Sequence, residues 1–319
     1  MASQHRPPFV LRDNKVPAGR SVRLELPIAH LMSGTPVALP LVVLHGRGDG
    51  PTMWLSGAIH GDEIAGVEII RQILGDLDPK TISGTLIAVP VVNVHGFNTG
   101  SRYLPDRRDL NRSFPGSARG SLASRIAHLL MTEVVSRCSV GIDLHTGSDE
   151  RTNLPQIRAD LDDPEVAALS HVFGAPIAIH SRVRDGSLRQ AGSESGATVL
   201  LYEGGEASRF DKDAITVGRL GVLRVLAHLG MTEKQPAAPP TATRFSRRTA
   251  WGRATKSGIL HLEADLGSRV EVGQPIASIV DPFGKRLGTV KARLGGIVIG
   301  QTQRPLVNQG DAVAHIAEL

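Results

Sequence analysis

The sequence contains one cysteine and few aromatic residues. Cys138 is the only cysteine among 319 residues, which excludes an internal disulfide, a cysteine-based zinc finger and an iron–sulfur cluster. Aromatic residues make up 3% of the chain, too few for the stacking platforms that bind single-stranded nucleic acid. The core of the protein must therefore be built mainly from aliphatic side chains.

Long apolar runs and blocks of one charge are also missing. No apolar run approaches the length of a membrane span, and residues 1–15 lack the apolar core of a signal peptide. Lys and Arg exceed Asp and Glu by 36 − 31 = 5, without the basic clusters that are typical of nucleic-acid binding. We therefore expect a cytoplasmic protein that binds no membrane and no nucleic acid, and that can form a homo-oligomer.

Strand-like and helix-like segments alternate over much of the chain. Short apolar runs predict buried strands, and apolar residues at helical spacing predict helices between them (strands at 53–59, 85–94, 139–147 and 197–205; helices at 60–77, 121–138 and 213–230). Such alternation predicts an α/β fold with a mostly parallel sheet and helices on both faces. Residues 1–50 are expected to be an extended N-terminal portion of this domain.

The C-terminal quarter of the chain has a different sequence pattern, which predicts strands without helices. We predict an α/β domain over residues 1–233, a linker over 234–246 and a small all-β domain over 247–319. The linker is rich in Pro and Ala, which predicts few contacts between the two parts. Residues 257–279 and 295–316 share a Gly-led strand, a turn, V-x-x-G and a second strand, so the β domain is expected to consist of two half-repeats.

Residues able to bind a metal follow two of the predicted strands. His60 and Glu63 lie where a strand meets a helix, and a spacing of three at a helix start would put them on one face. His145 ends another strand, and in such sheets ligands bind beyond the carboxyl ends of the strands. Two histidines and a glutamate suit a catalytic zinc ion. Either motif alone is more often a helix cap or a buried core histidine.

Two further segments carry groups suited to catalysis or binding. Glu203 ends the strand at 197–205, which suits a general base, and Glu206 in the same loop is the alternative. The loop from Ser101 to Gly116 is rich in arginine, and arginine can bind a carboxylate or polarise a carbonyl group. A solvated charged loop is the other interpretation of this segment.

Together these motifs resemble the succinylglutamate desuccinylase/aspartoacylase family, whose members are relatives of the zinc carboxypeptidases. The resemblance covers about residues 50–230 and consists of HGDE, RY…DLNR, DLHTG and a strand-end glutamate, in this order. It implies a zinc carboxypeptidase-like fold and one Zn²⁺ per chain. The roles it implies are zinc ligation by His60, Glu63 and His145, acid/base catalysis by Glu203, oxyanion stabilisation by Arg102, substrate-carboxylate binding by Asn111 and Arg112, and orientation of His60 by Asp109.

The activity implied by this resemblance is hydrolysis of the amide bond of a small N-acyl amino acid with a free carboxylate, or of a related N-acylated amine. Members of the family act on substrates such as N-acetyl-diaminobutyrate, N-acetylaspartate or N-succinylglutamate. Three alternatives remain at this stage. They are a metallocarboxypeptidase acting on short peptides, a non-catalytic zinc-binding protein, and a carrier module with a cofactor on Lys285, which lies in a turn between the two half-repeats.

Overall fold

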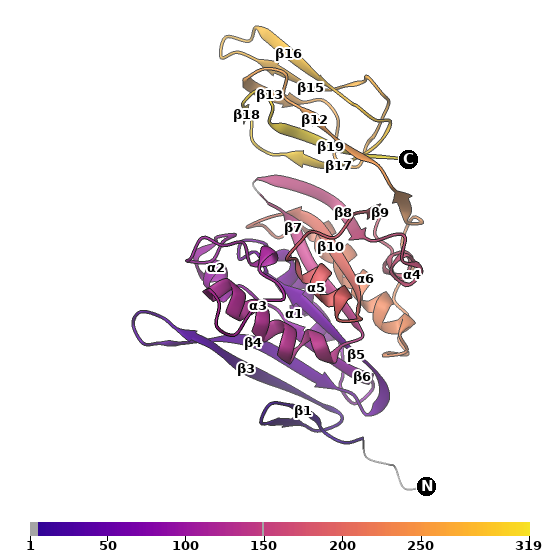
Figure 1. Ribbon diagram of the computed structural model, residues 1–319. Helices are drawn as coiled ribbons and strands as arrows, with labels where there is room; N and C mark the ends of the chain where they lie inside the picture. The colour runs from indigo at the N-terminus through magenta and orange to yellow at the C-terminus, as the bar shows by residue number, and fades with distance from the viewer. Residues whose placement is uncertain (1–5, 149) are drawn as a thin grey trace.

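The computed structural model describes residues 6–148 and 150–319 (Figure 1). Its largest element is a mixed sheet that runs through the whole molecule in the order β12-β19-β17-β8-β10-β7-β5-β6-β4-β3, with β9, β11 and β14 attached at the side. Its strands up to the linker are β3 (Arg20–His30), β4 (Pro36–His45), β5 (Gly48–Gly57), β6 (Ser83–Val89), β7 (Val140–Gly147), β8 (Arg151–Ala159), β9 (Ile177–His180), β10 (Thr198–Glu206) and β11 (Arg244–Ser246). A small hairpin of β1 (Phe9–Leu11) and β2 (Asn14–Val16) precedes them.

The centre of the sheet is parallel and its flanks are antiparallel. Strands β6, β5, β7 and β10 run in parallel, whereas β3 and β4 pair antiparallel with their neighbours. Strand β8 pairs antiparallel with β10 and β17 and parallel with β9. The predicted α/β class is therefore confirmed. Four central strands form its main parallel part, and β9 makes further parallel pairs with β8 and β11 at the side. The antiparallel β3–β4 pair accounts for the predicted extended N-terminal portion.

Helices cover both faces of the sheet because side chains of a strand alternate in direction. In β5, Trp54 packs into a cluster with α3 (Leu122–Glu133) and α5 (Leu188–Glu194) on one face. Its neighbours Met53 and Leu55 pack on the opposite face, into a second cluster with α1 (Ala65–Asp76), α4 (Pro164–Phe173) and α6 (Lys212–His228). Short helical segments α2 (Val94–Thr99), η1 (Leu110–Arg112) and η2 (Val135–Arg137) lie in the connections. Two buried aliphatic layers thus hold the strand ends in fixed positions.

The C-terminal part forms a β lobe at one end of the sheet (Figure 1). Its strands are β12 (Thr249–Arg253), β13 (Gly258–Leu262), β14 (Arg269–Val270), β15 (Pro275–Val280), β16 (Arg286–Lys291), β17 (Gly296–Thr302), β18 (Leu306–Val307) and β19 (Ala312–Glu318). Each predicted half-repeat supplies one strand triplet, β13–β14–β15 or β17–β18–β19. The short middle strand of each triplet pairs with the first strand of the other, so the two halves interlock.

Contacts between the two parts are more extensive than the linker composition predicts. The last residues of the predicted linker form β11, which pairs with β9, and β17 pairs with β8, so the large sheet is continuous between both parts. Ile177 and Ile179 of β9 form a buried cluster with Ile297, Ile299 and Ala317 of the C-terminal lobe. The expectation of few crossing contacts is therefore wrong, because sheet pairing continues across the boundary.

We expect a chain that ends at Lys234 to be markedly less stable than the full chain. Truncation would uncover Ile177 and Ile179. It would also leave the start of β8, which pairs with β17, and the outer edge of β9, which pairs with β11, without partners, which favours aggregation. The measurement is the thermal unfolding midpoint and the aggregation state of the truncated protein. A soluble monomer that unfolds at the temperature of the full chain would show that the two parts are energetically independent.

Within the described residues, no helix is long and apolar enough to span a membrane. The cytoplasmic location and the homo-oligomeric state stay predictions.

Candidate metal centre and active site

The chain brings His60 and Glu63 together through a tight turn rather than a helix. Helix α1 begins at Ala65, so both residues precede it, and the backbone N–H of Glu63 donates to the carbonyl oxygen of His60 over 3.1 Å. The predicted placement on one helical face is therefore wrong. The turn packs closely against α2, because a Cβ at Gly61 would lie 2.0 Å from the carbonyl carbon of Gly96. Only glycine fits at position 61, between this turn and α2.

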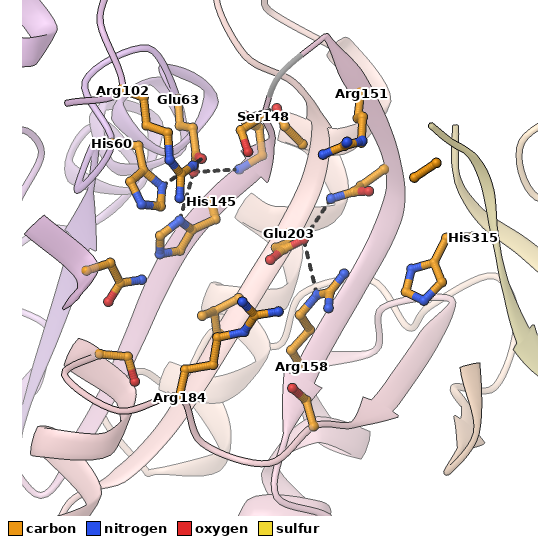
Figure 2. Close-up of a pocket in the computed structure, with 18 of the residues that line it drawn as sticks. His60, Glu63, Arg102, His145, Ser148, Arg151, Arg158, Arg184, Glu203 and His315 are labelled. Atoms are coloured by element: carbon orange, nitrogen blue, oxygen red, sulfur yellow. Dashed lines mark hydrogen bonds and ion pairs between the residues drawn. The ribbon is translucent and has the colours of Figure 1, made fainter. Parts of the chain in front are cut away.

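Three side chains converge at the ends of β5 and β7. The Nδ1 atoms of His60 and His145 lie 2.7 Å from the two carboxylate oxygens of Glu63, one on each. Their ligand atoms all lie within 4.8 Å of one another, and all three residues are buried. Figure 2 shows them together with Arg102 at one side of the pocket. The structure thus assembles the three predicted ligands from two segments that are 82 residues apart.

Each of the two imidazoles has its own aspartate next to its Nε2 atom, on the ring nitrogen that does not contact Glu63. Asp143 Oδ2 lies 2.7 Å from His145 Nε2, and its other oxygen accepts a hydrogen bond from the Ser56 hydroxyl over 2.7 Å. Asp109 Oδ1 lies 3.2 Å from His60 Nε2. Metal-binding histidines usually donate their second ring nitrogen to such a group, which leaves the other nitrogen free to coordinate. The sequence resemblance implies this position for Asp109, whereas Asp143 was not predicted.

The carboxylates and imidazoles of this cluster stabilise each other's charged forms. Burial alone favours the neutral imidazole of His145, but the carboxylates of Asp143 and Glu63 outweigh it and raise its pKa well above the usual value. Burial likewise opposes ionisation of Glu63, yet the two neighbouring imidazoles hold the pKa of Glu63 far below its usual range. Glu63 is therefore a buried carboxylate that needs positive charge next to it. Two nitrogen donors and a carboxylate are a ligand set that zinc prefers, so the group fits such an ion.

Glu203 lies beside this cluster on the neighbouring strand. It is the register partner of His145 in the parallel β10–β7 pair, so the two side chains point to the same face of the sheet. One of its oxygens accepts a hydrogen bond from Asn153 over 2.7 Å and lies 3.1 Å from Arg158 Nε. In Figure 2 it stands between the histidine cluster and His315. Glu206, the alternative acid, does not line this pocket and lies 3.5 Å from Arg209.

The arginine-rich segment reaches the site through Arg102, Asn111 and Arg112. Arg102 is held by Asp109 over 3.0 Å and by Glu63 over 3.3 Å, so its guanidinium borders the metal-binding group. The side-chain oxygen of the buried Asn111 accepts a hydrogen bond from the backbone N–H of Leu188. Its NH₂ group therefore points away from that backbone N–H. Asp109 also accepts from the backbone N–H of Asn111 over 2.9 Å. One aspartate therefore links His60, Arg102 and Asn111.

These groups line one cavity of about 530 Å³. Among the described residues that line it, arginines outnumber acids (Arg102, Arg112, Arg151, Arg158, Arg184, Arg189 and Arg253, against Glu63, Glu203 and Asp311). Arg107 and Arg108 of the same arginine-rich loop do not line it. The cavity therefore has an electropositive lining in which the two glutamates are already surrounded by basic groups.

The C-terminal lobe supplies one wall of the cavity, which the sequence analysis did not predict. Trp251 of β12 and His315 of β19 stack with ring centroids 4.5 Å apart and planes at 6°, and both line the cavity. Burial, followed by the charge of Arg158, lowers the pKa of His315 to about 3, so its ring is neutral. Nothing in the sequence of this lobe signals the position, because it depends on the pairing of β17 with β8.

Three comparisons place these findings among known proteins. Residues 49–229 match the sequence model of the succinylglutamate desuccinylase/aspartoacylase catalytic domain. Over 309 residues the chain is 29% identical to N-alpha-acetyl-L-2,4-diaminobutyric acid deacetylase of Halomonas elongata, with 93% of this chain and 90% of that protein covered.

Solved structures show the same fold over nearly the whole chain. A succinylglutamate desuccinylase/aspartoacylase from Rhodobacter sphaeroides is 28% identical with a TM-score of 0.83, and the match covers 95% of this chain and 98% of that one. The product-bound ectoine utilization protein EutE (DoeB) from Ruegeria pomeroyi is 26% identical with a TM-score of 0.85 and the same coverage.

Proposed function

The chain belongs to the succinylglutamate desuccinylase/aspartoacylase family, and on this premise we propose that it is a zinc-dependent deacylase of small N-acyl amino acids with a free carboxylate. The observation that carries the proposal is the convergence of His60, Glu63 and His145 next to Glu203 on the adjacent strand. A metal site and an acid on one face of a pocket are the two parts that amide hydrolysis needs. The Halomonas deacetylase, which matches over most of the chain, supports the same reaction type.

We assign His60, Glu63 and His145 as the residues that hold one zinc ion per chain. When bound there, zinc supplies Lewis acidity, which polarises a carbonyl group and makes a water molecule more acidic. Asp109 and Asp143 contact the Nε2 atoms of the two histidines, so that the Nδ1 atoms would be the ones to coordinate the ion. The Ser56 hydroxyl keeps Asp143 in place in turn.

Glu203 acts as the general base and then as the general acid. Its carboxylate takes the proton from the attacking water and delivers it to the nitrogen of the leaving amine. Asn153 and Arg158 both engage the same carboxylate oxygen of Glu203, which leaves the second oxygen for proton transfer. Arg102, fixed by Asp109 and Glu63, donates to the oxygen on which negative charge develops.

Asn111 and Arg112 bind the α-carboxylate of the substrate. Asn111 is locked by its bond from Leu188, so its NH₂ group is oriented before the substrate arrives. Arg112 adds a planar guanidinium that matches a carboxylate with two parallel hydrogen bonds. Because the α-carboxylate is a fixed few bonds from the scissile amide, this contact places the carbonyl group at the metal site.

Arg112→Lys is expected to lower kcat/KM for an N-acetyl amino acid by ~10-fold or more, because lysine keeps the charge but loses the planar fork. The methyl ester of the same compound lacks the carboxylate, so it should be a poor substrate and respond little to the substitution. Steady-state kinetics with the acid and the ester test this. Arg108→Lys is the matched control, because Arg108 is exposed in the same loop. Equal effects of Arg112→Lys on acid and ester would show that Arg112 does not bind the carboxylate.

A further inference from the structure

Asn153 contacts Glu203 from strand β8, and an irregularity in that strand makes the contact possible. Asn153 Nδ2 donates to Glu203 Oε2 over 2.7 Å, and Arg158 Nε lies 3.1 Å from the same oxygen. Asn153 and Arg158 are an odd number of residues apart, so in a regular strand their side chains would point to opposite faces of the sheet. Both nevertheless reach Glu203, because the pairing of β8 with β10 shifts register between them.

The register shift lies at Pro155 and the residue before it. Gln156 is opposite Glu203 and Asn153 is opposite Gly205, so β8 has one residue more than β10 over this stretch. Such a β-bulge changes the direction of the side chains that flank it, and bulges are frequent next to active sites. Proline fits at a bulge because it has no N–H group to contribute to the ladder. The bulge thus directs Asn153 to the face of the sheet that carries Glu203.

On its other side, Asn153 borders Gly300 of the C-terminal lobe. The two residues are opposite each other in the antiparallel pairing of β8 with β17, so a side chain at position 300 would point to the same face as Asn153. A Cβ at this position would lie 2.8 Å from Asn153 Oδ1, which is closer than the two atoms can approach without a shift. The absence of a side chain at Gly300 therefore leaves the space that the amide group of Asn153 occupies.

The strand that carries Gly300 is held on both sides at this point. The fully buried Gln156 donates from its side-chain NH₂ group to the carbonyl oxygen of Ile299 over 3.3 Å, which ties β17 to β8. On the opposite side Gly300 pairs with His315 of β19, and a Cβ at position 300 would lie 3.6 Å from the Cβ of His315. A methyl group added at position 300 would therefore displace the side-chain amide of Asn153 rather than the strand.

We propose that Asn153 is a positioning residue for Glu203 and that it depends on Gly300, so that the C-terminal lobe sets the orientation of the general base. This inference rests on the deacylase function proposed above. Asn153 and Arg158 hold one oxygen of Glu203, which leaves the second oxygen for proton transfer. Without the bond from Asn153 the carboxylate can rotate, so it adopts the geometry for proton transfer less often, while substrate binding changes little.

Asn153→Ala should lower kcat for an N-acetyl amino acid by ~10-fold or more, on the scale of one hydrogen bond to a charged group, with KM within ~3-fold of the wild-type value. Gly300→Ala should lower kcat to a similar extent, although it adds only a methyl group. Both variants should keep one zinc per chain. The matched control is Gly295→Ala in the same lobe, where a Cβ would meet nothing closer than 3.7 Å. This control should keep the wild-type kinetics.

The double variant Asn153→Ala/Gly300→Ala separates this mechanism from a general disturbance of the lobe. If Gly300→Ala acts by displacing Asn153, it should have little further effect once Asn153 is truncated. The double variant should therefore have a kcat within ~3-fold of that of Asn153→Ala, whereas two independent effects would multiply to ~100-fold or more. If Gly300→Ala does not fold, the double variant should fold, because the added methyl group no longer meets Oδ1. A double variant that is unfolded, or whose losses multiply, would overturn the role of Gly300.

Crystal structures of the zinc-loaded variants test the contact independently of activity. In Gly300→Ala, or in the wild-type chain as the reference, the measured quantity is the distance from Asn153 Nδ2 to the Glu203 carboxylate, which the substitution should increase beyond hydrogen-bond distance. An unmoved Asn153 amide, or wild-type kcat in Asn153→Ala when Glu203→Gln is inactive, would overturn the positioning role. Absence of hydrolysis by the wild-type protein would instead overturn the deacylase function, and displacement of Asn153 in the crystal would still support the contact through which the lobe holds Glu203.

Discussion

His145→Ala is expected to remove bound zinc and to lower kcat/KM for N-acyl amino acids by ~1,000-fold or more, which corresponds to about 4 kcal/mol of transition-state stabilisation. His145 is one of only three protein groups in the proposed ligand set, and a three-ligand site rarely retains its metal on two. His60→Ala should have the same effect. The measurements are metal analysis of the purified variants and steady-state kinetics on the same preparations.

His180→Ala provides the matched control for the metal variants. His180 also lies near two acids, Asp160 and Asp162, and these three could hold a cation, but they are more exposed and do not line the catalytic cavity. This variant should keep one zinc per chain and near-wild-type kinetics. Wild-type zinc content in both His60→Ala and His145→Ala would show that the metal binds elsewhere.

Glu203→Gln is expected to lower kcat by at least ~100-fold while the zinc content and the unfolding temperature stay unchanged. The amide has nearly the shape of the carboxylate but cannot accept the proton of the attacking water. Because Glu203 is not a ligand of the proposed metal site, loss of activity without loss of zinc separates its role from that of His145. Glu206→Gln is the control, since Glu206 lies on the same strand but does not line the cavity. Strong impairment of Glu206→Gln with an active Glu203→Gln would assign the base to Glu206.

The centre of the fold could be predicted because its residues follow simple periodicities. The buried runs that became β5, β7 and β10 are aliphatic and short, and α1, α3 and α6 show helical spacing of apolar residues. These elements carry or flank His60, Glu63, His145 and Glu203. The metal-binding group could therefore be proposed from the sequence, because strand ends in a parallel sheet meet at one edge.

The segment from Arg151 to Glu194 was not assigned, and it contains much of the cavity wall. Strand β8 has a proline at its centre and polar residues on both sides, so neither alternation nor an apolar run marks it. It pairs antiparallel with β10 and β17, which is a long-range arrangement that local sequence does not encode. Asn153, Arg158 and Arg189 were missed for this reason. Whether an arginine in this segment is buried depends on how distant strands pack together, which the local sequence does not show.

The interface with the C-terminal lobe was missed for a related reason. The Pro- and Ala-rich composition of residues 234–246 indicated a linker, yet a chain without helical or strand periodicity can still end in a paired strand such as β11. Trp251 and His315 face the cavity only because β17 and β19 continue the large sheet. Register across the two parts is a tertiary property, and no local pattern in either part specifies it.

The most direct test of the deacylase assignment is a metal-dependent assay with a panel of N-acyl amino acids. The purified protein should release free amine and free acyl acid in equal amounts from at least one member. It should lose this activity after chelation and regain it when one equivalent of zinc is restored. Hydrolysis that persists in the fully demetallated protein, or cleavage of short peptides while every N-acyl amino acid stays intact, would contradict the account.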